Sequence, residues 1–175
     1  MMMHKGMRML GALTMAAALT LSACGGSSES AGSSTAETAA GYGFTYEDHR
    51  YVPGMDAEEA LSLLGEPTAS RDVNNCARGA VRKAYSYGDR DFEVFADLNE
   101  SETKDVIKTI TLMSGKVSTE EGLSVGDEES RVTEVYPDCT EENGEYTAEK
   151  DGTEVVVSIN KLRGTVSYIT YQTAE

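Results

Sequence analysis

The stretch Val166–Tyr171, with the sequence VSYITY, repeats the pattern of Ile107–Leu112, with the sequence IKTITL. The two stretches align at an offset of 59 residues, and both are rich in β-branched residues. Such composition predicts β-strands. A match between two strands of one chain indicates an internal repeat of the fold.

A helix signal lies upstream of each strand. In the first copy Asp56 can cap a helix, Glu59 can complete a capping box, and Gly65 is a typical C-terminal stop. In the second copy, 72 residues later, Asp127 is the natural cap. The aligned pairs are Gly54 with Gly126, Asp56 with Glu128, Ala60 with Val132, Leu63 with Val135 and Leu64 with Tyr136.

Two more strands are expected between each helix and its final strand. In the first copy Tyr85–Tyr87 and Phe92–Ala96 flank the turn residues Gly88 and Asp89. In the second copy Tyr146 echoes Tyr87, and a strand over 154–159 follows a turn at 151–152. Residues 68–80 predict an irregular loop. The expected fold class is therefore α+β, with two helix–β–β–β repeats over 42–116 and 117–175, antiparallel sheet pairing and the helices on one face.

The N-terminal region has the organisation of an export signal. Leu10–Ala23 carries no charge and follows a basic segment with Lys5 and Arg8. An apolar segment of this length predicts a secretory signal rather than a membrane span. It ends in Leu21-Ser22-Ala23-Cys24, which resembles the bacterial lipobox. The resemblance implies a signal peptide over 1–23, a diacylglycerol on the Cys24 thiol and acylation of the new amino terminus. The alternative is an ordinary secretory signal with an incidental cysteine.

The composition after this segment favours a tethered acidic domain. Residues 25–41, GGSSESAGSSTAETAAG, lack aromatic and branched aliphatic residues and predict a flexible tether over 24–41. Removing residues 1–23 removes two of the 15 basic residues and none of the 30 acidic ones, so the formal charge becomes −17. Nucleic acid is excluded as an expected partner, because its binding needs clustered basic side chains.

Few residues of the mature chain have the chemistry of a site. Cys76 and Cys139 are a candidate disulfide in an oxidising compartment. His49 is the single histidine after residue 23 and is expected to be an ordinary surface or edge residue. No nucleophile, phosphate-binding or metal-binding motif is present, so no catalytic residue, metal or cofactor is predicted.

Tyrosines on the expected strands are the candidate binding surface, because tyrosine is favoured at protein interfaces. The alternative is that most of them are half-buried residues of the sheet. The five candidates are Tyr85, Tyr87, Tyr146, Tyr168 and Tyr171.

Several of these motifs together resemble a family. They are the helix ending in Leu64-Gly65-Glu66-Pro67, the strand Phe92-Glu93-Val94, the pair Ile107-x-x-Ile110 and the stretch Val117–Gly126. They resemble uncharacterised exported lipoproteins of Gram-positive bacteria. Their repeat looks like the fold of the β-lactamase inhibitor protein and of the small lipoprotein of the outer-membrane barrel-assembly machinery. The resemblance covers residues 50–172 and implies binding and scaffolding, on the outer face of the cell membrane.

Two functions follow as hypotheses. The first is a lipid-anchored, extracytoplasmic module without catalytic activity that binds or assembles with an unknown envelope or extracellular protein. The alternative is a cell-envelope hydrolase that uses paired carboxylates about 5 to 10 Å apart as acid and base. A stable spacer within a larger envelope complex is a third reading of the same features.

Overall fold

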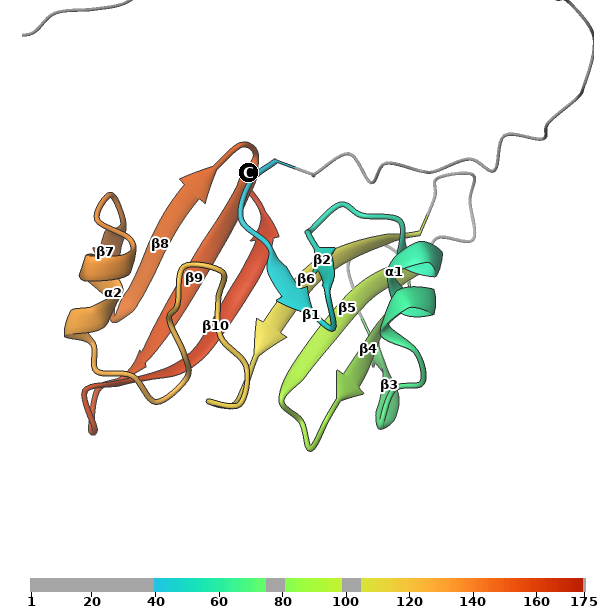
Figure 1. The fold of residues 1–175 in the computed structure, drawn as a ribbon, viewed down its shortest axis with the longest axis horizontal. Coiled ribbons are helices and arrows are strands. Elements are labelled where there is room, and N and C mark those ends of the chain that lie inside the picture. The colour runs from blue at the N-terminus through green and yellow to red at the C-terminus, as the bar shows by residue number, and fades with distance from the viewer. Residues whose placement is uncertain (1–39, 75–80, 99–104, 175) are drawn as a thin grey trace, which may run out of the picture. The chain divides into compact units, whose positions relative to one another are not determined.

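An antiparallel sheet of eight strands forms the body of the protein in the computed structural model, which describes residues 40–74, 81–98 and 105–174 (Figure 1). The strand order is β3-β4-β5-β6-β10-β9-β8-β7, so two four-stranded meanders meet where β6 pairs with β10. The strands are β3 (Ala69–Asn74), β4 (Val81–Tyr87), β5 (Phe92–Leu98), β6 (Val106–Leu112), β7 (Thr140–Glu142), β8 (Glu145–Lys150), β9 (Thr153–Asn160) and β10 (Thr165–Thr173).

The predicted fold class was wrong, because the protein is mostly β. The described residues contain ten strands but only two short helices, of eight and six residues. Four strands, not three, follow each helix. The missed strands are β3, in a stretch expected to be a loop, and β7. Both are edge strands with few branched aliphatic residues, and an edge position does not require the apolar alternation of a central strand.

The two matching stretches are the central neighbours of the sheet. Ile110 of β6 pairs with Tyr171 of β10, and Leu112 pairs with Ile169. These four side chains are fully buried. Because paired residues share a face, the matched pattern places one continuous apolar stripe across the junction of the meanders.

Only one face of the sheet carries the core. Side chains of the central strands alternate between the core and the other face, as in a half-buried sheet. One register shift interrupts the alternation between the buried Ile107 and Ile110, and another interrupts it between Val166 and Ile169. Both helices and a second, two-stranded sheet contribute to the described residues of this core. Its largest fully buried side chains are Tyr51, Tyr136, Tyr171, Phe44, Phe92, Ile107, Ile110, Leu112, Leu123 and Ile169.

The first helix, α1 (Ala57–Leu64), begins and ends as its sequence predicted. The Asp56 carboxylate accepts a hydrogen bond from the Glu59 backbone N–H at 3.1 Å, which satisfies one of the unpaired donors of the first turn. Gly65 follows the helix with a φ of 72°, a conformation that glycine adopts at little cost. Ala57, Ala60 and Leu64 face the core.

The second helix, α2 (Ser130–Val135), begins differently from the prediction. Its cap residue is Glu129, which makes no side-chain cap bond. The Asp127 carboxylate instead accepts a bond from the Ser124 backbone N–H at 2.9 Å, three residues upstream of itself. Asp127 therefore stabilises the turn that precedes the helix rather than the helix itself.

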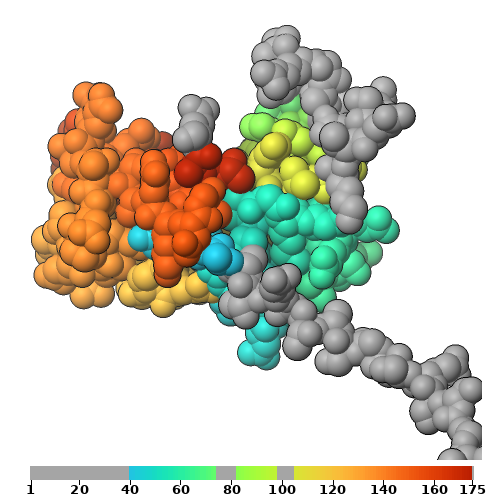
Figure 2. All heavy atoms as spheres, turned by 90° about the horizontal axis from the view of Figure 1, so that it is seen from above, coloured from blue at the N-terminus to red at the C-terminus, as the bar shows by residue number. Residues whose placement is uncertain are grey.

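A hairpin of β1 (Phe44–Tyr46) and β2 (His49–Tyr51) packs on the core face (Figure 1). Its two-residue turn, Glu47 and Asp48, has positive φ at both positions, as a type I′ turn requires. Figure 2 shows the cyan hairpin residues between the orange C-terminal meander and the green and yellow N-terminal part. The Phe44 ring packs against Phe92 of β5, and Arg50 bonds to Glu120, so the hairpin contacts both parts of the described chain.

No helix among the described residues has the length and the apolar character needed to cross a membrane. The predicted signal peptide, Cys24 and most of the predicted tether lie outside the described residues.

Candidate functional site

The five candidate tyrosines differ in how far the structure buries them. Tyr87 and Tyr171 are 4% and 0% exposed and belong to the core, and Tyr85 and Tyr146 pack against it. Tyr168 alone of the five is a well-exposed side chain, at 43%. Four of the five side chains therefore lie on the buried face of the sheet, which is the alternative that the sequence had left open.

The environments of these tyrosines explain their burial. Tyr87 stacks on the Phe92 ring with centroids 5.2 Å apart, and burial raises the pKa of Tyr87 to about 12. The Tyr146 hydroxyl donates a hydrogen bond to Glu129 at 2.8 Å. That bond and partial burial raise the pKa of Tyr146 to about 12. Tyr87 thus packs within the sheet, and Tyr146 connects β8 to the residue that precedes α2.

One of the two cysteines of the candidate disulfide lies among the described residues. Cys139 is a free thiol of intermediate exposure, and Cys76 lies outside the described residues. The disulfide between them therefore stays a prediction.

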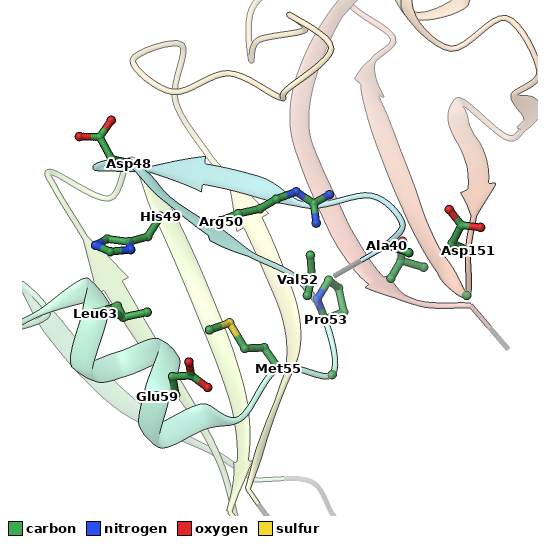
Figure 3. Close-up of a pocket in the computed structure, with 13 residues that line it drawn as sticks. Ala40, Asp48, His49, Arg50, Val52, Pro53, Met55, Glu59, Leu63 and Asp151 are labelled. Carbon is green, nitrogen blue, oxygen red and sulfur yellow. The ribbon is translucent and has the colours of Figure 1, made fainter. Parts of the chain in front are cut away.

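A cleft of about 680 Å³ lies where the hairpin, α1 and the turn between β8 and β9 meet (Figure 3). This volume is within the range of about 300 to 1,000 Å³ that is usual for ligand sites. The lining residues are Ala40, Asp48, His49, Arg50, Val52, Pro53, Gly54, Met55, Glu59, Leu63, Asp151, Gly152 and Thr153.

The segment Val52–Met55 holds the cleft in place. The Gly54 backbone N–H donates to the Ile107 carbonyl at 2.7 Å, and the Ile107 N–H donates to the Met55 carbonyl at 2.8 Å. Gly54 has a φ of 88°, which favours glycine at this bend. The bonds attach the cleft segment to the central strand β6, so its apolar side chains have a rigid support.

The polar side chains of the cleft are not arranged as a catalytic pair. Asp48, Glu59 and Asp151 come from three different elements, and Figure 3 shows their carboxylates apart from one another. His49 is exposed on β2. No group of three or more histidine, cysteine or acidic side chains in the described ranges could hold a metal ion. The sequence offered no signal for this cleft, because its walls come from two distant parts of the chain, within 40–63 and 151–153.

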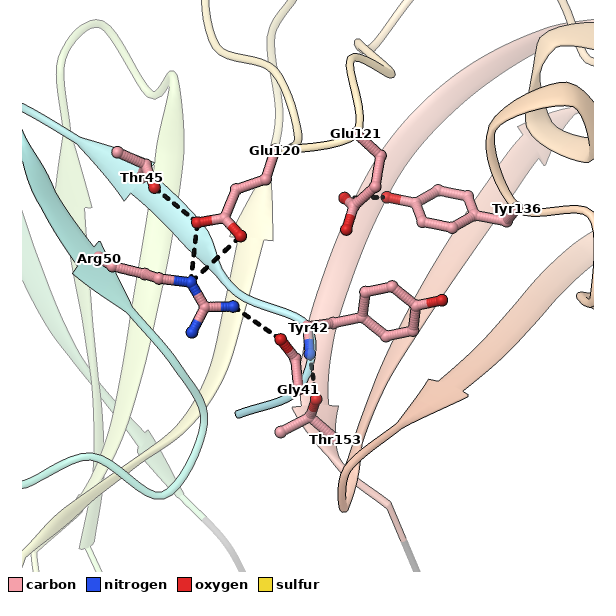
Figure 4. A network of polar contacts seen from close by, with 8 residues as sticks. All are labelled: Gly41, Tyr42, Thr45, Arg50, Glu120, Glu121, Tyr136 and Thr153. Carbon is pink, nitrogen blue, oxygen red and sulfur yellow. Dashed lines mark hydrogen bonds and ion pairs between the residues drawn. The ribbon is translucent and has the colours of Figure 1, made fainter. Parts of the chain in front are cut away.

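A polar network beside the cleft holds the first described residues in place (Figure 4). Arg50 Nε contacts the two Glu120 carboxylate oxygens at 2.9 and 3.1 Å, and Thr45 Oγ1 donates to the same carboxylate at 2.6 Å. A second nitrogen of Arg50 donates to the Gly41 carbonyl at 2.6 Å. The network thus joins the hairpin to the loop that precedes α2.

Gly41 and Tyr42, near the start of the described chain, contact the C-terminal meander. The Tyr42 backbone N–H donates to Thr153 Oγ1, and the Tyr42 ring meets the Tyr136 ring edge-on with centroids 5.5 Å apart. The Tyr136 hydroxyl donates to Glu121 at 3.0 Å. A side chain at Gly41 would collide with Thr153 Oγ1 and would approach the Lys150 carbonyl to 2.9 Å. Glycine is therefore required where the chain enters the domain.

Glu120→Gln should destabilise the fold in a pH-dependent way. Burial opposes ionisation of Glu120, but the bonds from Thr45 and Arg50 outweigh it, so its pKa lies below its ordinary value. A carboxylate whose pKa is lower in the folded state than in the unfolded state stabilises the fold at pH values above its unfolded-state pKa. This stabilisation is lost as the pH falls through the folded-state pKa. We expect the variant to lose about 1 kcal/mol of unfolding free energy at pH 7.

Urea denaturation at pH 7 and at pH 3 measures this effect. The difference between the wild type and Glu120→Gln should shrink at the lower pH. A Glu121→Gln variant is a neighbouring control, because Glu121 accepts from Tyr136 but has no arginine partner. A Glu120→Gln penalty that is the same at both pH values would contradict the ionic role of Glu120.

Comparison with known proteins shows one distant likeness of fold. No protein-family model and no curated protein sequence matches the chain. The structure is similar to the 1.5 Å crystal structure of an extracellular protein containing an SCP domain from Bacillus anthracis, with a TM-score of 0.50 and 13% sequence identity. The match covers 69% of this chain and 43% of that chain, so this chain spans less than half of that protein. At this identity the likeness concerns the fold alone, and the resemblance to exported lipoproteins stays a prediction.

Proposed function

We propose that this protein is a lipid-anchored, extracytoplasmic module that binds an envelope or extracellular protein and has no catalytic activity of its own. The observation that supports this most is the cleft beside the hairpin. Its Val52, Pro53, Met55 and Leu63 side chains present an apolar surface, and Leu63 is 39% exposed. Exposed apolar side chains rimmed by polar ones are typical of protein contact sites.

The anchor and the location come from the sequence. The lipobox-like Leu21–Cys24 supports acylation at Cys24, and two acyl chains suffice for stable anchoring. The uncharged Leu10–Ala23 segment supports export. The B. anthracis protein of similar fold is itself extracellular. The tether would hold a domain of strongly negative charge away from anionic lipid headgroups.

The hydrolase alternative has less support. It needs two carboxylates from different elements facing one substrate at a separation of about 5 to 10 Å. The three carboxylates of the cleft lie apart in Figure 3, on the turn of the hairpin, on α1 and on the turn between β8 and β9. Among the described residues no observation favours catalysis over binding.

Leu63→Ser should strongly reduce partner recovery from membranes. The exposed Leu63 side chain is the part of the apolar floor that a partner can reach most easily. Cells that express the tagged full-length protein are treated with a chemical crosslinker, and the tagged complexes are recovered and quantified. We expect a loss of about tenfold in the partner band, which corresponds to about 1.4 kcal/mol of binding free energy.

Leu162→Ser is the matched control, because Leu162 is 99% exposed in the turn between β9 and β10, away from the cleft-lining residues. It should leave recovery unchanged. Equal recovery of the partner with Leu63→Ser and the wild type would reject the cleft as the contact site. Recovery of no partner, together with turnover of a cell-wall-derived substrate, would favour the hydrolase.

A further inference from the structure

We infer that the cleft takes an extended protein segment in which a basic side chain lies between apolar ones. This inference rests on the proposed function and adds the chemistry of the partner to it. It depends on the apolar floor of the cleft, on the charge of its rim and on the contacts of its single arginine.

The floor of the cleft suits apolar side chains. Val52 and Pro53 are buried and form its base, while Met55 is half-buried. Leu63, one of the few large apolar side chains that the described residues expose, projects from α1 (Figure 3). Covering it would remove apolar surface from water, which stabilises a complex in proportion to the area buried.

The rim of the cleft carries negative charge that is not paired with a basic side chain among the described residues. Asp48, Glu59 and Asp151 are all exposed. None of these carboxylates forms an ion pair or a side-chain hydrogen bond with another residue that the structure describes. Because the three come from three elements around the floor, a basic group above the floor would be attracted by all of them.

Arg50 does not cancel this charge. It lines the cleft, but its guanidinium lies in the network of Figure 4, with Nε 2.9 Å from Glu120. Its positive charge is therefore already matched by a carboxylate outside the cleft lining. The formal charge of the whole chain is −15, which adds a long-range attraction for basic partners.

The size of the cleft favours a chain segment over a small cation. About 680 Å³ accommodates several residues of an extended peptide. A free metal ion would need several oxygen ligands within about 2.6 Å, and the described residues contain no such cluster. An acidic segment would meet like charges on three sides of the floor.

Ligand-observed NMR with defined peptides tests this chemistry. The full-length lipidated protein is held in nanodiscs of zwitterionic phosphatidylcholine at about 0.15 M salt, so that the lipid itself attracts no peptide. The acetylated and amidated probes are GALKLAG, GALELAG and GASKSAG. We expect the first to bind with at least a tenfold lower dissociation constant than either of the others.

Charge-neutral variants identify the place of binding. Glu59→Gln and Asp151→Asn should each weaken GALKLAG binding about threefold, as expected for exposed ion pairs. Glu58→Gln removes the same charge from the neighbouring exposed position of α1, outside the cleft lining, and should change nothing. A uniform loss in all three variants would mean non-specific attraction and would overturn the inference.

Three further outcomes would also overturn it: equal binding of GALELAG, equal binding of GASKSAG, or no binding of any probe. Failure here is distinguishable from failure of the proposed function. If Leu63→Ser still strongly reduces partner recovery from membranes while the peptides show no preference, the cleft binds a protein of different chemistry. If both experiments fail, the cleft is not a binding site.

Discussion

Phe92→Ala should lower the free energy of unfolding by about 4 kcal/mol, the usual cost of deleting a buried phenylalanine ring. Phe92 is fully buried. Its ring lies 4.9 Å from that of Phe44 and 4.8 Å from that of Tyr46 on the hairpin, and 5.2 Å from that of Tyr87 on β4. The truncation would therefore leave a cavity at the contact between the hairpin and the sheet, and aromatic pairing would be lost as well.

Phe95→Ala is the matched control on the same strand. Phe95 lies on the opposite face of β5, where it is half-exposed and packs under Arg71 with the guanidinium 5.7 Å from the ring centre. Its loss should cost about 1 kcal/mol, from one partly exposed cation–π contact and a small loss of buried area. Urea denaturation of the wild type and both variants measures how much unfolding free energy each substitution removes. Equal penalties would contradict the assignment of the buried face.

Cys24→Ala should move the protein from the membrane to the soluble exported fraction. The expected thioether and amide-linked acyl chains contribute about 0.8 kcal/mol for each buried CH₂ group, so their loss removes the attachment entirely. Fractionation of cells followed by detection of the protein measures the distribution. Cys76→Ala is the control that also removes one thiol, and it should stay with the membrane. A Cys24→Ala protein that remains membrane-bound would reject the lipobox interpretation.

Local signals in the sequence predicted local structure well. The capping residue Asp56 and the stop at Gly65 bound α1 as expected, and the turn at Asp151 and Gly152 joins β8 to β9 with both φ values positive. The offset of 59 residues identified β6 and β10, which are neighbours in the sheet. These features depend on a few adjacent residues, whose conformational preferences act without the rest of the fold.

Features that depend on sheet position were predicted less well. β3 and β7 were missed because edge strands need no buried alternation, and this error gave the wrong fold class. The tyrosines were placed on strands correctly, but the sequence pattern does not indicate which face of the sheet is covered by the rest of the protein. Asp127 precedes α2 and still does not cap it, because its carboxylate is used by the Ser124 N–H.

The cleft could not have been predicted from sequence patterns. Its walls join the hairpin, α1 and a turn of the second meander, and these meet only because the chain from Gly41 to Tyr51 crosses between the two meanders. Arg50 and Glu120, 70 residues apart, hold that crossing in place. No local propensity encodes such a contact, and one sequence alone contains no evidence of residue pairs that vary together.

Site-specific photo-crosslinking tests most directly whether the cleft of the anchored protein contacts a partner. p-Benzoyl-phenylalanine is introduced in place of Leu63, or in place of Leu162 as the exposed control, and intact cells are irradiated. We predict a discrete adduct with one envelope or extracellular protein from position 63 and none from position 162. Absence of an adduct at position 63, or the same adducts from both positions, would contradict the account.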